Sequence, residues 1–154
     1  MVSEGEKVLV RNSWALVVAN DEADLGSTGL AMFIRLFSDE PDLMKLFPFA
    51  NGLTQSSLSQ SPRVRKHGSH VLTTVGKAVA MLDDTNTLVK TLNALGKRHV
   101  GYGVKPDYFE PVGKALVSTL ESKLGKDFTP EMKQAWVNLF VVVTSLMKDG
   151  MNAA

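Results

Sequence analysis

The 154-residue sequence contains no cysteine. This absence excludes disulfide bonds, thiolate nucleophiles and every metal or cluster site that needs a cysteine ligand. A chain that needs no disulfide suits a reducing compartment. We therefore expect a cytoplasmic protein.

Long apolar runs are also missing. No run approaches the ~18 apolar residues that suggest a membrane span, and the opening residues MVSEGEK lack the apolar core of a signal peptide. The formal net charge is only +1, so the chain as a whole offers no broad basic field to nucleic acid. We expect neither a membrane nor a nucleic-acid partner, and a small molecule instead.

The sequence has no sustained alternation of apolar and polar residues, the pattern typical of strands. Apolar residues recur every three or four positions through most of the chain, which indicates amphipathic helices. Hydrophobic residues make up 44% of the chain and charged residues 21%, enough for one core in a single domain over residues 1–154. We predict an all-α protein of about seven crossed helices.

Local signals place the ends of these helices. Ser3 and Glu6 form a capping box for a first helix that ends near the polar segment 20–24. A second helix is expected over residues 25–38, followed by a turn that opens at Pro41 and a loop over residues 46–61. The later helices are expected to cover about 61–82, 88–99, 105–124 and 129–147.

Two histidines fall on the apolar stripes of consecutive helices. His67 follows Val64 by three residues, and His99 follows Leu95 by four, so both side chains are expected to face the interior. The turn at Asp83 lies 16 residues from each histidine, so two helices that fold back there place both rings at a similar height. Two facing imidazoles between apolar residues suit a flat iron macrocycle.

Other interpretations of these residues remain open. Either histidine alone also fits a hydrogen-bonded core residue. His67 and His70 have the spacing of a zinc-binding pair, but no third ligand follows at a recognisable spacing. The basic run of Arg63, Arg65 and Lys66 fits a solvated face, a nucleic-acid patch or a partner for the carboxylates of a cofactor.

Taken together, these features resemble the globin family from about residue 8 to residue 147. The matching positions are Trp14, the segment 33–37, Pro41 with Phe47 six residues later, the segments 61–67 and 95–99, Val104, Phe109 and Trp136. Phe33, the segment around His67 and the Gly-Lys-Arg-His stretch are most similar to neuroglobin and cytoglobin within that family. The resemblance points to an invertebrate nerve, muscle or general tissue globin.

The resemblance implies a haem b with His99 as the proximal iron ligand and His67 on the distal, gas-binding side. It also implies that His99 donates its other ring N–H to a backbone carbonyl one turn earlier, near Leu95. His70 stands where related globins more often have Lys, Arg or Thr, so it reaches a haem propionate or competes with His67. The remaining pocket residues that the resemblance implies are Phe33 beside the gas, Phe47 stacked on the porphyrin, Lys66 near a propionate, and Val71, Leu95, Val104 and Phe109 as the lining.

Two functions follow from the resemblance. In the first, a primarily non-enzymatic protein binds dioxygen or another diatomic gas reversibly for storage or transport, as a monomer or a homodimer. In the second, His67 moves inward as a sixth iron ligand, as the likeness to neuroglobin suggests, and the haem acts in nitric oxide, nitrite, peroxide or redox-sensing chemistry. Turnover would then need an external reductase, because the sequence has no flavin or reductase domain. A globin fold without haem is a third interpretation.

Overall fold

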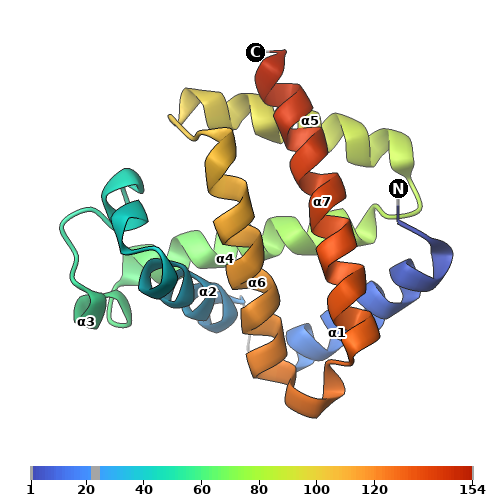
Figure 1. Cartoon of the computed structure of the whole chain (residues 1–154), viewed down its shortest axis with the longest axis horizontal. Helices are drawn as coiled ribbons and strands as arrows, with labels where there is room; N and C mark the ends of the chain where they lie inside the picture. The colour runs from blue at the N-terminus through green and yellow to red at the C-terminus, as the bar shows by residue number, and fades with distance from the viewer. Residues whose placement is uncertain (1, 22–24, 154) are drawn as a thin grey trace.

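The computed structural model describes residues 2–21 and 25–153, and these contain helices and no strand. The prediction of an all-α fold is confirmed (Figure 1). The α-helices are α1 (Glu4–Asn20), α2 (Gly26–Asp39), α3 (Gln55–Leu58), α4 (Pro62–Ala80), α5 (Thr85–Gly101), α6 (Phe109–Leu124) and α7 (Pro130–Asn152). Three short 3-10 helices are η1 (Pro41–Leu46), η2 (Pro106–Tyr108) and η3 (Gly125–Asp127).

The helix ends follow the local signals in the sequence. Ser3 and Glu6 form the predicted capping box at the start of α1. The Ser61 hydroxyl accepts a hydrogen bond from the backbone N–H of Val64, and Pro62 follows the cap as the first residue of α4. The predicted polar end of the first helix reaches residues 22–24, which lie outside the described part of the chain.

The structure differs from the prediction in the segment 46–61. We expected a loop, but the chain forms the short helix α3, which is capped by Thr54. The Thr54 hydroxyl accepts a hydrogen bond from the backbone N–H of Ser57, and Leu58 is fully buried. A helix of one turn leaves no periodic apolar pattern, so only its cap marks it in the sequence.

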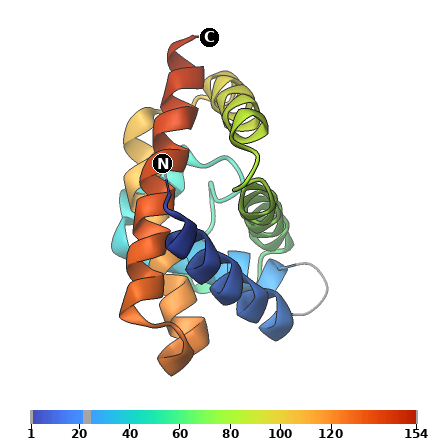
Figure 2. The ribbon, with the colours of Figure 1, turned by 90° about the vertical axis from the view of Figure 1, so that its right-hand side faces the viewer.

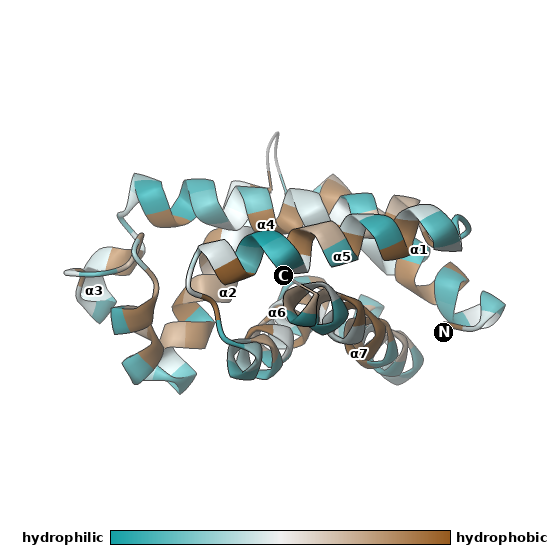
Figure 3. Cartoon of the chain, turned by 90° about the horizontal axis from the view of Figure 1, so that it is seen from above, coloured by the Kyte–Doolittle hydropathy of each residue, from teal (hydrophilic) through white to brown (hydrophobic). Residues whose placement is uncertain are grey.

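The helices form two layers around the site. α4 and α5 lie on one side of the molecule, and α6 and α7 cross them on the other (Figures 2 and 3). α4 packs on α2 and α5 packs on α7, so each helix of the α4–α5 layer has a different main partner. No helix within residues 2–21 and 25–153 is long and apolar enough to cross a membrane.

Glycines allow both of these helix pairs to approach closely. Gly29 of α2 faces Gly68 of α4, and a Cβ on either would collide with the backbone of the other. Gly96 of α5 lies against the backbone of Met147, and Gly150 of α7 lies against Asn93 in the same way. The two crossings therefore depend on residues without a side chain.

The buried side chains form two clusters. The larger cluster joins α1, α2, α4, α6 and α7, and it contains the paired rings of Trp14 and Trp136. The smaller cluster joins α5 to α6 and α7 through Leu88, Leu92, Phe109 and Met147, and it also includes Ala78 of α4. The partly buried Val143 packs against both clusters. The core is thus divided between the two ends of the α4–α5 layer.

Candidate functional site

The two predicted histidines stand on α4 and α5, each beside a glycine crossing. Gly68 follows His67 directly, and it holds α4 against α2. Gly96 precedes His99 by three residues, and it holds α5 against α7. The close packing that glycine permits therefore fixes the height of both imidazoles relative to the core.

His99 has a defined ring orientation. Its Nδ1 lies 2.7 Å from the backbone carbonyl oxygen of Leu95, one turn earlier, as predicted. A carbonyl oxygen can only accept, so Nδ1 carries the proton and donates it, and Nε2 keeps its free lone pair. The rings of Tyr102 and Phe109 lie 5.9 and 6.0 Å from the imidazole, centroid to centroid. The structure thus orients Nε2 of a half-buried imidazole as the ring nitrogen available to a metal.

His67 lies at the edge of the larger cluster. Its ring stacks on Phe49 at a centroid distance of 4.0 Å and an interplanar angle of 19°, and Phe33 lies 5.6 Å away. The ring turns toward the aromatic side chains of the larger cluster, as predicted, but the residue is exposed in this structure and is therefore not part of the buried core. The position of His67 on the apolar face of α4 directs its ring toward Phe33 and Phe49, but these side chains do not bury the residue.

The surroundings of His67 favour its neutral form. Desolvation by the surrounding chain lowers the pKa of His67 below 6.5, and the neighbouring imidazoles of His70 and His99 lower it further. Desolvation opposes the charged form, and a second imidazolium would be repelled by the first. His67 therefore keeps one donor N–H and one lone pair near neutral pH.

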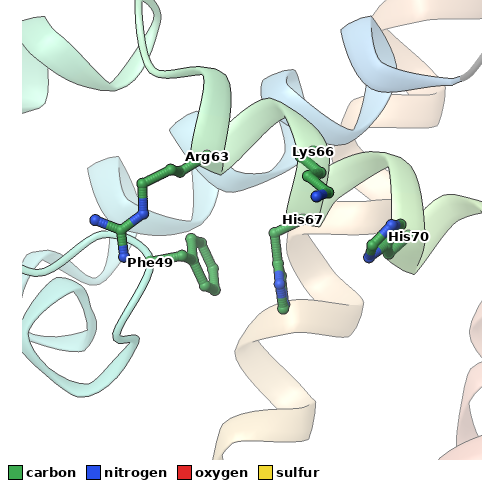
Figure 4. Close-up of a pocket in the computed structure, with 5 residues that line it drawn as sticks. All are labelled: Phe49, Arg63, Lys66, His67 and His70. Atoms are coloured by element: carbon green, nitrogen blue, oxygen red, sulfur yellow. The ribbon is translucent and has the colours of Figure 1, made fainter.

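A hollow of about 250 Å³ opens beside His67 and has a basic wall. It is lined by Phe49, Arg63, Lys66, His67 and His70 (Figure 4). Arg63 reaches toward the loop that carries Phe49, and its guanidinium donates a hydrogen bond of 3.2 Å to the carbonyl oxygen of Pro48. The predicted residues Lys66 and His70 are both exposed at this wall. Cationic side chains around one hollow suit carboxylates.

The other predicted site residues divide between the two clusters. Phe33 is buried in the larger cluster, where Phe47 and Val71 pack against it. Phe109 is buried in the smaller cluster, where Leu95 and Val104 pack against it. The structure therefore places one apolar group beside His67 and another beside His99.

The sequence analysis did not include three aromatic residues among the site residues. Phe49 stacks on His67, Tyr102 contacts His99, and Tyr108 lies 6.1 Å from Phe47 between ring centroids. The sequence Phe47-Pro48-Phe49 could have indicated Phe49 as a site residue, because Phe49 is only two positions from the predicted site residue Phe47 in the same segment. Tyr102 and Tyr108 gave no such signal, because Tyr102 lies in a turn and Tyr108 lies in the three-residue helix η2, and neither segment has a periodic apolar pattern.

The available donors fit an iron macrocycle better than a metal ion held by the chain alone. Within residues 2–21 and 25–153, no three His, Cys, Asp or Glu side chains gather to hold a metal ion. Two imidazoles on consecutive helices, each with apolar side chains nearby, match a metal whose remaining ligands come from a flat, apolar macrocycle. The basic wall matches the carboxylates that such a macrocycle carries at its edge.

Comparison with known sequences and structures gives the following relatives. The profile of the globin family matches residues 30–147. Neuroglobin from Tetraodon nigroviridis is 36% identical over 151 residues, which cover 97% of this chain and 92% of that protein. Neuroglobin from Danio rerio is 35% identical with the same coverage.

Solved structures agree with the fold. A hexacoordinated haem protein from an anhydrobiotic tardigrade is similar with a TM-score of 0.87 and 24% identity, covering 98% of this chain and 96% of that one. A double mutant of myoglobin from Aplysia limacina is similar with a TM-score of 0.83 and 27% identity, covering 96% of this chain and 97% of that one. The overall arrangement of the helices is thus shared with both structures.

Proposed function

Because this chain belongs to the globin family, we propose that it holds one haem b between α4 and α5 and binds dioxygen or another diatomic gas reversibly. Storage or transport of the gas is the proposed role, and the cytoplasm is the proposed location. Ferrous haem supplies the reversible coordination of the gas. The observation that carries the proposal is the hydrogen bond from Nδ1 of His99 to Leu95, which leaves Nε2 free as the iron ligand.

His99 is the proximal ligand in this proposal. Its hydrogen bond to the Leu95 carbonyl fixes the tautomer and the ring orientation and raises the basicity of Nε2. Leu95, Val104 and Phe109 supply the apolar surface on the same side. These side chains exclude water from the proximal face, which favours the ferrous state.

His67 acts on the distal side. As a neutral imidazole it donates its N–H to the bound gas, and a charge-assisted hydrogen bond of this kind is worth about 1.5–3 kcal/mol. Phe49 stacks on the ring and Phe33 contacts it, and Val71 and Phe47 add to the apolar wall. Loss of the donor would speed release of the gas by about ten- to a hundredfold.

The basic wall holds the edge of the cofactor. Lys66 and His70 are the proposed partners of the propionates, and Arg63 joins them at the same hollow. A charge-assisted hydrogen bond from any of these side chains anchors a carboxylate without entering the apolar pocket. The wall therefore retains the cofactor, and the two histidines determine its chemistry.

The test is the absorption spectrum of the haem-reconstituted chain in the ferrous, gas-free state. An open sixth position gives one broad visible band. His99→Gly is expected to lose this spectrum and to regain it with added imidazole, because the small ligand replaces the missing side chain. His70→Gln, one turn from His67 on α4, is the matched control and should keep the iron-ligand bands. Haem binding with an unchanged spectrum in His99→Gly would refute the assignment.

A second function is favoured by one observation. The pKa of His67 is lowered, chiefly by desolvation, so near neutral pH its imidazole is neutral and has a lone pair that can bind iron. If Nε2 of His67 binds the iron, the gas must displace it. The protein would then act in nitric oxide, nitrite or redox chemistry with electrons from an external reductase. Two sharp visible bands in the ferrous spectrum, lost in His67→Leu, would select this function.

A further inference from the structure

The positive charge of this chain is concentrated on the two helices that carry the histidines. Helices α4 and α5 contain seven Lys and Arg residues and no Asp or Glu. In α1, α2, α6 and α7 the Lys and Arg residues equal the Asp and Glu residues in number. The seven residues, all exposed, are Arg63, Arg65, Lys66, Lys77, Lys90, Lys97 and Arg98. One layer of the molecule is therefore basic, although the net charge is only +1.

Helix stability does not account for this distribution. The N-terminus of a helix favours acidic side chains, and α1, α6 and α7 each have Glu in the first turn. The first turn of α4 instead contains Arg63 and Arg65 and no acidic residue. Arg98 in the last turn of α5 suits the helix dipole, but the arginines of α4 oppose it. The sequence keeps basic residues here at a cost to the helix.

The proposed cofactor does not neutralise the layer either. Haem b carries two propionates, whereas α4 and α5 carry seven basic side chains. Lys97 and Arg98 precede His99 directly and do not line the hollow that we assign to the propionates. These two side chains therefore need another explanation.

Exposed apolar residues lie beside them at the end of α5. Val100 is 44% exposed and Tyr102 is 68% exposed. The Tyr102 ring also contacts the ring of His99 at 5.9 Å. An apolar and an aromatic side chain that follow two basic residues at the end of one helix combine the apolar and charged groups found at protein–protein interfaces. We call Lys97, Arg98, Val100 and Tyr102 the α5 surface.

We propose that the α5 surface docks an acidic electron-donor protein, a flavin- or haem-containing reductase. The proposal rests on the proposed function, because the donor passes one electron to ferric haem, which becomes ferrous while the donor loses that electron. Tyr102 brings this surface into contact with the proposed iron ligand, because its ring lies against the ring of His99. Positive charge near the cofactor raises the rate at which an acidic donor meets it. The exposed apolar centre favours a protein over nucleic acid, whose phosphates need only the charges.

Reduced flavodoxin, an acidic flavin protein, is the probe, and reduced riboflavin is the small uncharged comparison. Stopped-flow absorbance measures reduction of the ferric, haem-loaded chain without oxygen. The flavodoxin rate should fall as salt rises from about 0.01 to 0.5 M, because salt screens the attraction. The double variant Lys97→Glu with Arg98→Glu should lower that rate about tenfold or more at low salt and leave the riboflavin rate unchanged.

The matched control is Lys114→Glu with Lys133→Glu, which makes the same change in net charge on α6 and α7. It should keep the flavodoxin rate within about twofold. Equal loss in both double variants would mean that only net charge matters, and it would overturn the proposal. A flavodoxin rate insensitive to salt and to both variants would also overturn it.

Two further measurements separate this proposal from the proposed function and from nucleic-acid binding. If haem does not bind, the proposed function fails, while calorimetry of flavodoxin with the haem-free chain still measures docking. Binding that is lost in Lys97→Glu with Arg98→Glu supports the α5 surface, and binding equal in both double variants refutes it. Tighter binding of a duplex DNA than of flavodoxin at about 0.15 M salt would assign the basic layer to nucleic acid instead.

Discussion

The stacking of His67 on Phe49 joins a helix residue to a loop residue, and it links protonation of the site to folding. The chain around His67 lowers its pKa below 6.5, chiefly by desolvation. Above pH 6.5 the imidazole is neutral in both the folded and the unfolded chain. As the pH falls below 6.5 the unfolded chain takes up the proton first, so stability decreases until the pH passes the folded-state pKa.

This linkage predicts the effect of removing the imidazole. His67→Gln should reduce the loss of unfolding free energy between pH 7 and pH 5, because glutamine does not titrate. Urea unfolding of the haem-free chain at several pH values measures the difference. His70→Gln serves as the control on the same helix. A pH dependence that is identical in His67→Gln and the unsubstituted chain would show that His67 does not contribute.

Phe49 should contribute to the desolvation that lowers the pKa of His67. Phe49→Ala removes the ring that stacks on His67, so water reaches the imidazole and its pKa should rise toward 6.5. NMR titration of the histidine ring protons in the haem-free chain measures this shift. Tyr102→Ala is the control, because Tyr102 contacts His99. An unchanged His67 pKa in Phe49→Ala would assign the desolvation to the remaining neighbours.

The two sides of the site differed in how far the sequence could predict them. The bond from His99 to Leu95 follows from helix geometry, since residues four apart face each other along one side. Phe49 reaches His67 from a loop, and the path of a loop is not encoded by apolar spacing. The family resemblance together with local helix geometry therefore predicted the proximal side, whereas the contact of Phe49 on the distal side needed the tertiary structure.

Helix crossings are the element-scale feature that positions both histidines. The sequence analysis predicted the ends of most helices, because caps and prolines act locally. It could not predict which glycine meets which backbone, because Gly96 and Met147 are brought together only by the packing of α5 on α7. The height of His99 depends on that crossing.

Gly96→Ala should therefore damage both stability and cofactor retention. The added methyl group collides with the backbone of Met147, and overpacking of this kind costs about 1–3 kcal/mol. Displacement of α5 also moves His99, so haem should dissociate faster. Gly101→Ala in the same helix is the matched control, since its Cβ meets nothing within 4 Å. Urea unfolding and haem transfer to an acceptor protein measure the two effects. Equal behaviour of both variants would contradict the role of the crossing.

At the scale of the whole molecule, the net charge does not show how the charged residues are distributed among the helices. A net charge of +1 led us to expect no broad basic field, yet the α4–α5 layer is basic and the other long helices are balanced. The acidic residues that compensate for this layer lie mainly in the connections between helices, such as Asp83, Asp84 and Asp107. The distribution of charge over the helices must therefore be known before the net charge is used to exclude a class of binding partner.

The divided core makes a final prediction about how the cofactor affects folding. α5 is buried mainly through the smaller cluster, whereas α1, α2 and α7 share the larger one. An element with fewer buried apolar contacts opens at lower free energy. Hydrogen exchange of the haem-free chain should therefore be faster in α5 than in the part of α7 around Trp136, whose indole N–H donates to Ser13.

Haem binds only the folded arrangement of α4 and α5, so it should slow exchange in α5 more than in α1. Mass spectrometry of the exchanged chain, with and without haem, resolves the helices. His99→Gly should lose most of this protection in α5, and added imidazole should restore it. Equal protection of α1 and α5 would mean that the cofactor stabilises the molecule as one unit, and that the smaller cluster does not unfold separately from the larger one.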